Sequence, residues 1–132
     1  MDNINDPRFV THNSKNRNDI LEAHKESTDA SVIVSPSFTE GIDLYDDLSR
    51  WQVICKVPYP YLGDNYIKEK MDRIKTWYSW ETAKTLIQST GRSVRSDTDF
   101  AITYILDESF IYFYNKNPQL FPQWFKDALD FI

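Results

Sequence analysis

Short apolar runs rich in β-branched residues, separated by long intervals, most constrain the fold of this 132-residue chain. A strand is indicated near FVTH at residues 9–12, and three more at SVIVSPS (31–37), WQVICKVPYPY (51–61) and AITYILD (101–107). Helical patterns occupy the intervals, and such intervals are too long for hairpins but suit the crossovers of parallel strands. The pattern therefore predicts an α/β fold in which a small parallel sheet, of about three or four strands, has flanking helices.

The apolar residues within these runs are continuous rather than alternating, which favours strands that are buried on both faces. Amphipathic helices are predicted at residues 16–26 and 119–132. The second carries an aromatic stripe at helical spacing, and we expect this stripe to pack in the core rather than to bind a ligand.

Composition places the chain among ordered globular proteins, because 41% of its residues are hydrophobic and only three are glycine. The lone Cys55 predicts a reduced, buried thiol and excludes a zinc or iron–sulfur site of several cysteines within these residues. No apolar run approaches the ~18 residues of a membrane span, so we expect a cytoplasmic protein without membrane association. The net charge of −5 argues against bulk electrostatic binding of nucleic acid, so any such contact must be local.

The stretch QSTGRSVR at residues 88–95 places a glycine and two arginines in a predicted helix that begins with Ser79 as its N-cap. Projection at about 100° per residue gathers Gln88, Arg92 and Arg95 on one side. Residues of the opposite, sheet-facing side are Ala83, Leu86, Ile87, Thr90 and Val94.

Glycine within a helix costs about 1 kcal/mol relative to alanine, so Gly91 predicts a close approach of backbone at that point. Two interpretations of the arginines remain open. Positively charged side chains stabilise the C-terminal end of a helix, so a solvated basic face would be enough to explain the arginines. Guanidinium groups also stabilise the charge that develops during phosphoryl transfer, which would make them arginine fingers.

Four stretches together resemble superfamily 2 helicases. QSTGRSVR is similar to motif VI, Q-x-x-G-R-x-x-R, and SFTEGIDL at 37–44 resembles the motif V region of the XPD and DinG group. KVPYP at 56–60 is similar to the K-x-P-[FY]-P stretch between those motifs, and DTDFAITYILD at 97–107 resembles the strand after motif VI. Their order and spacing agree over residues 9–130.

The resemblance implies a truncated second RecA-like domain of an ATP-dependent DNA helicase. Residues 1–132 would form this single partial domain, with residues 1–8 as a flexible N-terminus. Arg92 and Arg95 would contact the phosphates of ATP, bound with Mg²⁺ in a cleft between two domains. Gln88 and Gly91 would help to form that cleft.

The motif V region carries further implied roles. Glu40, Gly41 and Asp43 would contribute to the nucleotide site and couple it to single-stranded DNA. Thr39 would contact the DNA backbone, a contact that hydroxyl groups commonly make.

Other helicase features are absent from the sequence, which has neither G-x-x-x-x-G-K-[ST] nor a D-E-A-[HD] box. We therefore expect no ATP hydrolysis by this chain alone, and a P-loop domain in trans. The iron–sulfur cluster of the group belongs to the first domain and is not expected here. Family members often have an arginine at the position of Ser109, so its absence puts coupling in doubt.

Two functions from different classes follow. The chain is either the C-terminal part of a split helicase, of the kind a phage or another compact genome could carry, or a non-catalytic helicase remnant that binds DNA or a protein. The half-cleft would leave apolar surface exposed, and a homodimer is one way to cover it.

Three other patterns have simpler interpretations. His12 and His24 lie apart in a polar segment and predict locally bonded or solvated side chains rather than a metal site. The acidic run at 43–47 lacks the calcium-loop pattern and predicts a turn. WYSW at 77–80 could stack on bases, but core packing of one or both tryptophans is the favoured interpretation.

Overall fold

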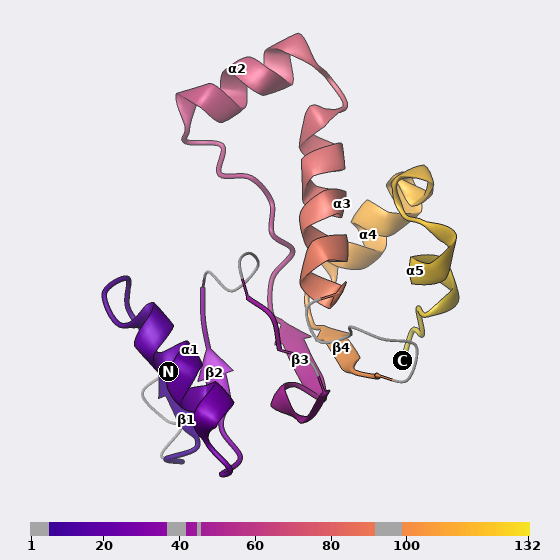
Figure 1. Ribbon diagram of the computed structural model, residues 1–132. Coiled ribbons are helices and arrows are strands. Elements are labelled where there is room, and N and C mark those ends of the chain that lie inside the picture. The colour runs from indigo at the N-terminus through magenta and orange to yellow at the C-terminus, as the bar shows by residue number, and fades with distance from the viewer. Residues whose placement is uncertain (1–5, 37–41, 45, 92–98) are drawn as a thin grey trace.

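The computed structural model describes residues 6–36, 42–44, 46–91 and 99–132. Two parallel strand pairs and their connecting helices form the fold (Figure 1). The elements, in chain order, are β1 (Phe9–Thr11), α1 (Arg17–Glu26), β2 (Val32–Val34), η1 (Asp46–Leu48), β3 (Trp51–Ile54), α2 (Asn65–Arg73), α3 (Trp77–Thr90), β4 (Ile102–Ile105), α4 (Ser109–Lys116), η3 (Pro118–Leu120) and α5 (Gln123–Asp127).

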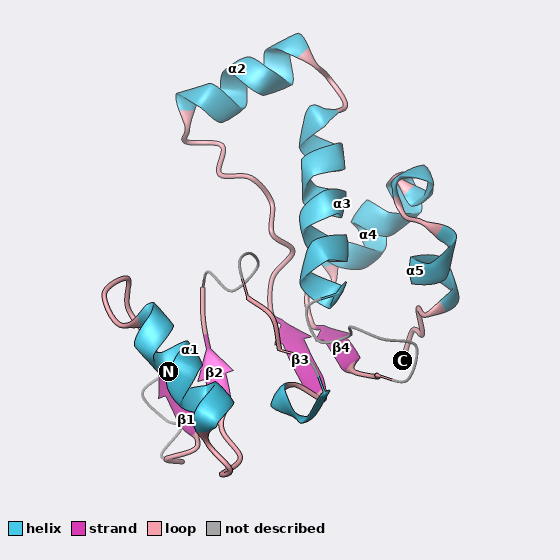
Figure 2. Cartoon of the chain, in the orientation of Figure 1, coloured by secondary structure: helices cyan, strands magenta, loops and turns pink. Residues whose placement is uncertain are grey.

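Both strand pairs confirm the predicted parallel α/β arrangement. β1 pairs with β2 across the crossover helix α1, and β3 pairs with β4 across α2 and α3. Within the described residues the strands form two separate sheets, whereas the sequence had suggested one (Figure 2). The strands nevertheless coincide with the predicted apolar runs.

The core lies on one side of β3 and β4, where α3, α4 and α5 cover the sheet (Figure 1). Ile54 and Ile105 point into this core from the paired strands. The buried cluster comprises Val57, Ala83, Leu86, Phe110, Phe113, Phe121 and Phe125. Four of these seven residues are phenylalanines, and edge-to-face contacts such as Phe113 with Phe121, at 6.1 Å between centroids, hold them together.

The opposite face of β3 and β4 is exposed, so the prediction that strands are buried on both faces is wrong here. In the parallel register Trp51 is paired with Ile102 and Val53 with Tyr104. All four side chains are exposed. Alternation along a strand sends neighbouring side chains to opposite faces, so only the face that carries Ile54 and Ile105 meets the helices. Cys55, directly after β3, is also exposed rather than buried.

The predicted C-terminal helix at 119–132 is interrupted. η3 ends at Leu120 and α5 starts at Gln123, with Pro122 as its N-cap. Proline has no amide hydrogen, so a continuous helix would lose a hydrogen bond at this position. Phe121 and Phe125 are buried as predicted for the aromatic stripe, but Trp124 is exposed.

Candidate functional site

The end of α3 carries the described part of the motif VI segment. Gln88 is exposed in the last turn of α3, and Gly91 is exposed at its C-cap. Arg92 and Arg95 follow directly but lie outside the described residues, as do Thr39, Glu40 and Gly41. Of the predicted site residues, the structure therefore places Gln88 and Gly91 together, and Asp43 in the segment that precedes η1.

The two sides of α3 differ in burial as the helical projection predicts. Ala83 and Leu86 are buried, Leu86 completely at 0% exposure, whereas Gln88 is exposed. Thr82 and Ser89 are also buried, which an apolar pattern does not reveal. Their hydroxyl groups donate to the carbonyls of the preceding turn, at 2.9 and 2.7 Å, so burial leaves neither of these two hydroxyls unpaired.

A side chain from β3 fixes the last turn of α3 against the sheet. The Nε2 of Gln52 donates to the carbonyl oxygen of Ser89 at 2.9 Å and to Oγ1 of Thr103 on β4 at 2.7 Å. Gln52 is the second residue of β3, so the helix ends toward the amino ends of β3 and β4. This contact holds the last turn of α3 in place, and no local pattern in the sequence predicts it.

Gly91 occupies the C-cap rather than a helix interior, which corrects the prediction for this residue. α3 starts at Trp77, two residues before the predicted N-cap Ser79, and the amide of Gly91 donates to the carbonyls of Ile87 and Ser89. A Cβ atom at Gly91 would meet no described heavy atom within 4 Å, and its φ of −80° suits any residue. The predicted close approach of backbone is therefore wrong among the described residues, and neither the backbone angle nor the space around Gly91 requires glycine at this helix end.

An ion pair joins the segment before β3 to the segment before β4. The Nη1 of Arg50 donates to Oδ1 of Asp99 at 2.9 Å, and the amide of Asp46 donates to Oδ2 of Asp99 at 3.2 Å. The Asp99 side chain is only 1% exposed, and the Arg50 guanidinium lies 4.6 Å from the centre of the Phe100 ring. Although burial opposes it, hydrogen bonds and charges from Asp47 and Asp99 raise the pKa of Arg50.

This Arg50–Asp99 pair stands beside both sequence motifs. Asp99 is the first described residue after 92–98, and Asp46 follows the motif V segment, where Asp43 is half-buried. The two segments that the helicase resemblance joins in one site are thus tied at their described ends. The sequence offers no local signal for a pairing across 49 residues.

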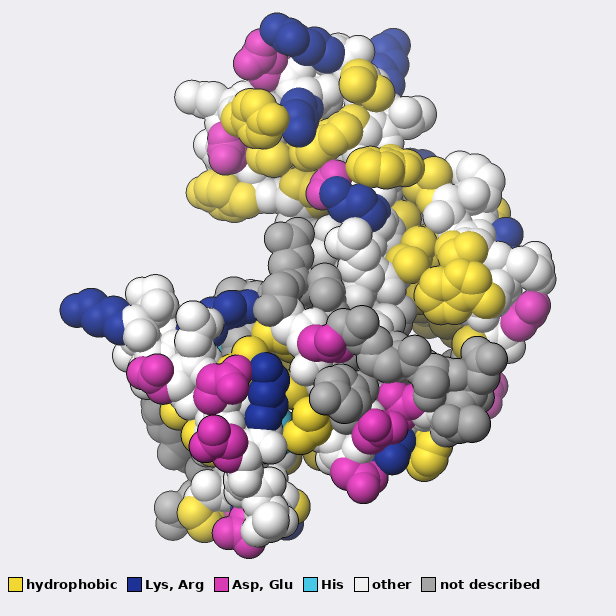
Figure 3. All heavy atoms as spheres, viewed as in Figure 1, with side chains coloured by type: hydrophobic (Ala, Val, Ile, Leu, Met, Phe, Trp, Pro, Cys, Tyr) yellow, Lys and Arg dark blue, Asp and Glu magenta, His cyan; other side chains and the backbone are white. Residues whose placement is uncertain are grey.

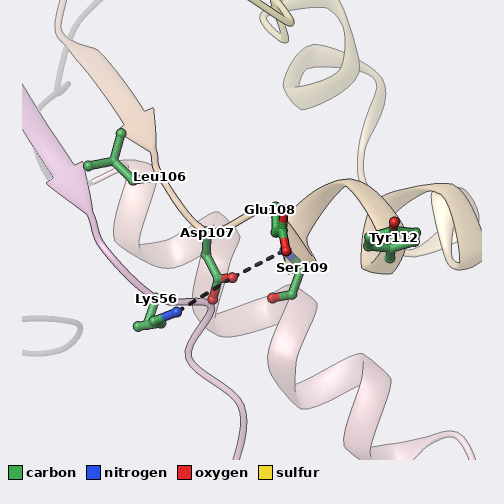
Figure 4. Close-up of a pocket in the computed structure, with 6 residues that line it drawn as sticks. All are labelled: Lys56, Leu106, Asp107, Glu108, Ser109 and Tyr112. Carbon is green, nitrogen blue, oxygen red and sulfur yellow. Dashed lines mark hydrogen bonds and ion pairs between the residues drawn. The ribbon is translucent and has the colours of Figure 1, made fainter.

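A second contact between the β3 and β4 segments lies at the carboxyl ends of these strands. Asp107 accepts hydrogen bonds from the amide of Val57 at 3.0 Å and from the amide of Ser109 at 3.1 Å. The Val57 bond chiefly lowers the pKa of Asp107, the Ser109 bonds and the charge of Lys56 lower it further, and burial opposes them. A cavity of about 400 Å³ opens beside this carboxylate, where the open-sheet rule places a ligand crevice (Figure 4).

The WYSW stretch lies at the start of α3, and neither tryptophan joins the core, contrary to the prediction. Trp80 is 50% exposed with the Lys84 ammonium 5.0 Å from its ring centre. Trp77 is half-buried and lies 5.1 Å from the Lys70 ammonium. Tyr78 packs more closely, because its hydroxyl donates to the carbonyl of Pro60 at 3.2 Å.

Hydrogen bonds to residues distant in sequence hold both histidines. The Nε2 of His24 lies 2.9 Å from the carbonyl oxygen of Leu48, and Nδ1 lies 2.7 Å from Oγ of Ser31. The Nε2 of His12 lies 2.6 Å from Oγ of Ser35. In the part of the chain that the structure describes, no three His, Cys, Asp or Glu side chains gather as a metal site would require. Among the described helices, none is long and apolar enough to cross a membrane.

Comparison with known proteins identifies the family of this chain. The family of the helicase C-terminal domain matches residues 2–128, so the chain belongs to that family. The resemblance to the second domain of XPD and DinG-type helicases is thereby confirmed.

Three relatives are named as helicases. The chain is 28% identical over 107 residues to a regulator of telomere elongation helicase 1 homolog of Caenorhabditis elegans, covering 69% of this chain and 10% of that protein. It is 26% identical over 134 residues to ATP-dependent DNA helicase CHL1 of Vanderwaltozyma polyspora, covering 83% of this chain and 16% of that protein. It is 25% identical over 126 residues to ATP-dependent DNA helicase DDX11 of Mus musculus, covering 83% of this chain and 13% of that protein. The chain thus spans 10 to 16% of the length of these relatives.

Proposed function

We propose that this domain supplies Arg92 and Arg95 to an ATP site whose P-loop domain lies outside these 132 residues. The family membership and the relatives named as ATP-dependent DNA helicases support the reaction class. The single observation that carries the proposal is the end of α3, where Gln88, on the same predicted helix side as the arginines, is exposed while Leu86 is buried.

The chemistry follows from the charge of the reacting phosphate. The P-loop domain would hold ATP and Mg²⁺, and Arg92 and Arg95 would reach the transferring phosphoryl group from the second domain. A guanidinium group in this position stabilises the charge that spreads over the phosphate oxygens in the transition state. Gln88 and Gly91 would line the cleft beside them.

Coupling to DNA would pass through the motif V segment. Thr39 would contact the backbone of single-stranded DNA, and Glu40, Gly41 and Asp43 would connect that contact to the nucleotide. The Arg50–Asp99 pair supports such coupling, because it joins the chain near motif V to the chain after motif VI.

Replacement of Arg92 in a reconstituted pair tests this proposal. The wild-type chain is mixed with a helicase P-loop domain from the same genome, and ATP hydrolysis is measured with single-stranded DNA present. Arg92→Ala should lower the rate by about 10³-fold or more, the usual worth of an arginine finger. Arg73→Ala, an exposed arginine on α2, is the matched control and should leave the rate unchanged. Undiminished hydrolysis by a folded Arg92→Ala chain would reject the role.

The alternative is a binding module without nucleotide chemistry. The exposed apolar face of β3 and β4, with Trp51, Val53, Ile102 and Tyr104, favours it, because contiguous exposed apolar surface marks interaction sites. A second copy of the chain is one candidate for covering this face. Light scattering at high concentration would show a dimer if this is so, and a monomer would count against self-association.

A further inference from the structure

Two neighbouring cavities share the ring of Tyr112 on α4. The first, of about 400 Å³, lies among Lys56, Asp107 and Tyr112 at the carboxyl ends of β3 and β4 (Figure 4). The second, of about 280 Å³, is lined by Tyr59, Tyr78 and Lys116 together with Tyr112. We infer that this surface, here named the tyrosine groove and defined by Lys56, Tyr59, Tyr78, Tyr112 and Lys116, binds single-stranded DNA.

Tyr59 forms a fixed platform within the groove. Its ring stacks on Tyr78 with centroids 6.0 Å apart and planes 7° apart, and meets Phe113 edge-on at 5.8 Å. The hydroxyl of Tyr78 is itself held by the carbonyl of Pro60. A ring held in this way loses little conformational entropy when a base stacks on it. Tyr59 retains an exposed surface that can receive a base.

Tyr112 provides the second, open ring. It is 76% exposed although it stands at the junction of the two cavities. Ser109, Tyr112 and Lys116 lie three and four residues apart, so they share one side of α4. The groove therefore follows that side of the helix from the Lys56 cavity toward Lys116.

Lysines at both ends supply the charge that a DNA backbone requires. The Lys56 side chain is 86% exposed, and its ammonium lies 4.0 Å from Asp107, so it can also reach a phosphate. Lys116 is exposed in the last turn of α4. Asp107 and the exposed Glu108 also line the first cavity and oppose the charge of Lys56 there. Among the described residues that line the second cavity, Lys116 is the charged one, so the positive charge of the groove lies at that end.

Aromatic rings interspersed with lysines are the usual means of binding single strands without sequence preference. Such a local site agrees with the net charge of −5, which argues against binding of nucleic acid by bulk electrostatics. Hydrophobic side chains also gather over α2 and near α4 and α5 on the face seen in Figure 3. The inference rests on the proposed function for the identity of the ligand and adds a contact surface away from the arginines.

The test is fluorescence anisotropy of labelled oligo(dT) with the full chain and no nucleotide. Tyr112→Ala should weaken binding about 5- to 100-fold, the range for loss of one stacked base. Tyr66→Ala is the matched control, since Tyr66 is 60% exposed on α2 and lines neither cavity, and it should bind as the wild type does. An abasic oligomer of equal length should bind the wild-type chain at least as weakly as oligo(dT) binds Tyr112→Ala, because it cannot stack on Tyr59 either.

The lysines are tested through salt. The double variant Lys56→Gln and Lys116→Gln should reduce the slope of log affinity against log salt by about 1.4, at about 0.7 for each phosphate contact. Lys68→Gln with Lys75→Gln, two exposed lysines outside the groove, should leave the slope unchanged. An equal loss in both double variants would overturn the assignment of Lys56 and Lys116.

Three results would overturn the inference as a whole. These are equal affinity of Tyr112→Ala and wild type, equal affinity for abasic and normal oligomers, and no binding at about 100 µM chain, the weak end of non-specific binding. Failure of the proposed function is distinguishable, because Arg92→Ala should remove ATP hydrolysis by the pair while Tyr112-dependent binding of oligo(dT) by the chain alone persists.

Discussion

The two strand pairs have the same parallel topology but very different cores. β3 and β4 pack against α3, α4 and α5 through a cluster of seven buried side chains. In the described residues of the β1–α1–β2 unit, only Leu21 is a buried hydrophobic. The same topology therefore does not give the two units the same stability, because burial of apolar surface supplies most of the favourable free energy of folding. We expect β1–α1–β2 to open more readily than the rest.

Substitution in the larger core should have the greatest effect. Leu86→Ala should lower the free energy of unfolding by about 2–5 kcal/mol, because the residue is completely buried and its neighbours would leave a cavity. Urea denaturation followed by circular dichroism measures this.

Leu21→Ala is the matched substitution in the smaller unit and should cost less than about 2 kcal/mol, since few buried neighbours surround the site. Hydrogen exchange should likewise show faster exchange in α1 than in α3. An equal cost for the two leucines, or equal protection of the two helices, would break the comparison.

Gln52→Ala should have an intermediate effect within the larger unit. The variant removes the donor to Ser89 and Thr103 and so should cost about 1–2 kcal/mol, the worth of two net hydrogen bonds. The same urea measurement applies, with Gln88→Ala as the exposed control. A neutral result would show that the end of α3 is held by other contacts.

Asp107→Asn should reveal its effect only in part of the pH range. The pKa of Asp107 is lower in the folded state than in the unfolded state. Its contribution to the free energy of unfolding is therefore fully present above the unfolded-state pKa of about 3.9, and it is lost as the pH falls through the folded-state pKa. The stability difference between wild type and variant should therefore be largest near neutral pH and shrink in acid. A difference that stays constant between neutral and acidic pH would contradict this origin of the stabilisation.

Gln88→Ala should have the smallest effect on stability. Exposed substitutions usually change the free energy of unfolding by less than about 0.5 kcal/mol. In the pair with a P-loop domain, however, the proposed function predicts slower ATP hydrolysis. An unchanged rate together with unchanged stability would remove Gln88 from the site.

Local patterns in the sequence were sufficient for the strands and for the two sides of α3. Apolar runs marked β1 to β4, and helical spacing separated Leu86 from Gln88. Contacts distant in sequence were not predictable, as with Arg50 and Asp99, or Asp107 and Val57. The burial of β3 and β4 was overestimated, because an apolar run does not indicate how many faces of a strand are covered. The C-terminal helix was predicted too long, because Pro122 interrupts a segment whose aromatic residues have helical spacing.

The most direct test of the central claim is titration of the wild-type chain into a helicase P-loop domain from the same genome, with ATP and single-stranded DNA in excess. We predict that neither protein hydrolyses ATP rapidly alone, and that the rate rises and saturates as the chain is added. A rate that stays at the level of the P-loop domain alone, at every concentration of the chain, would contradict the claim that this domain completes an ATP site.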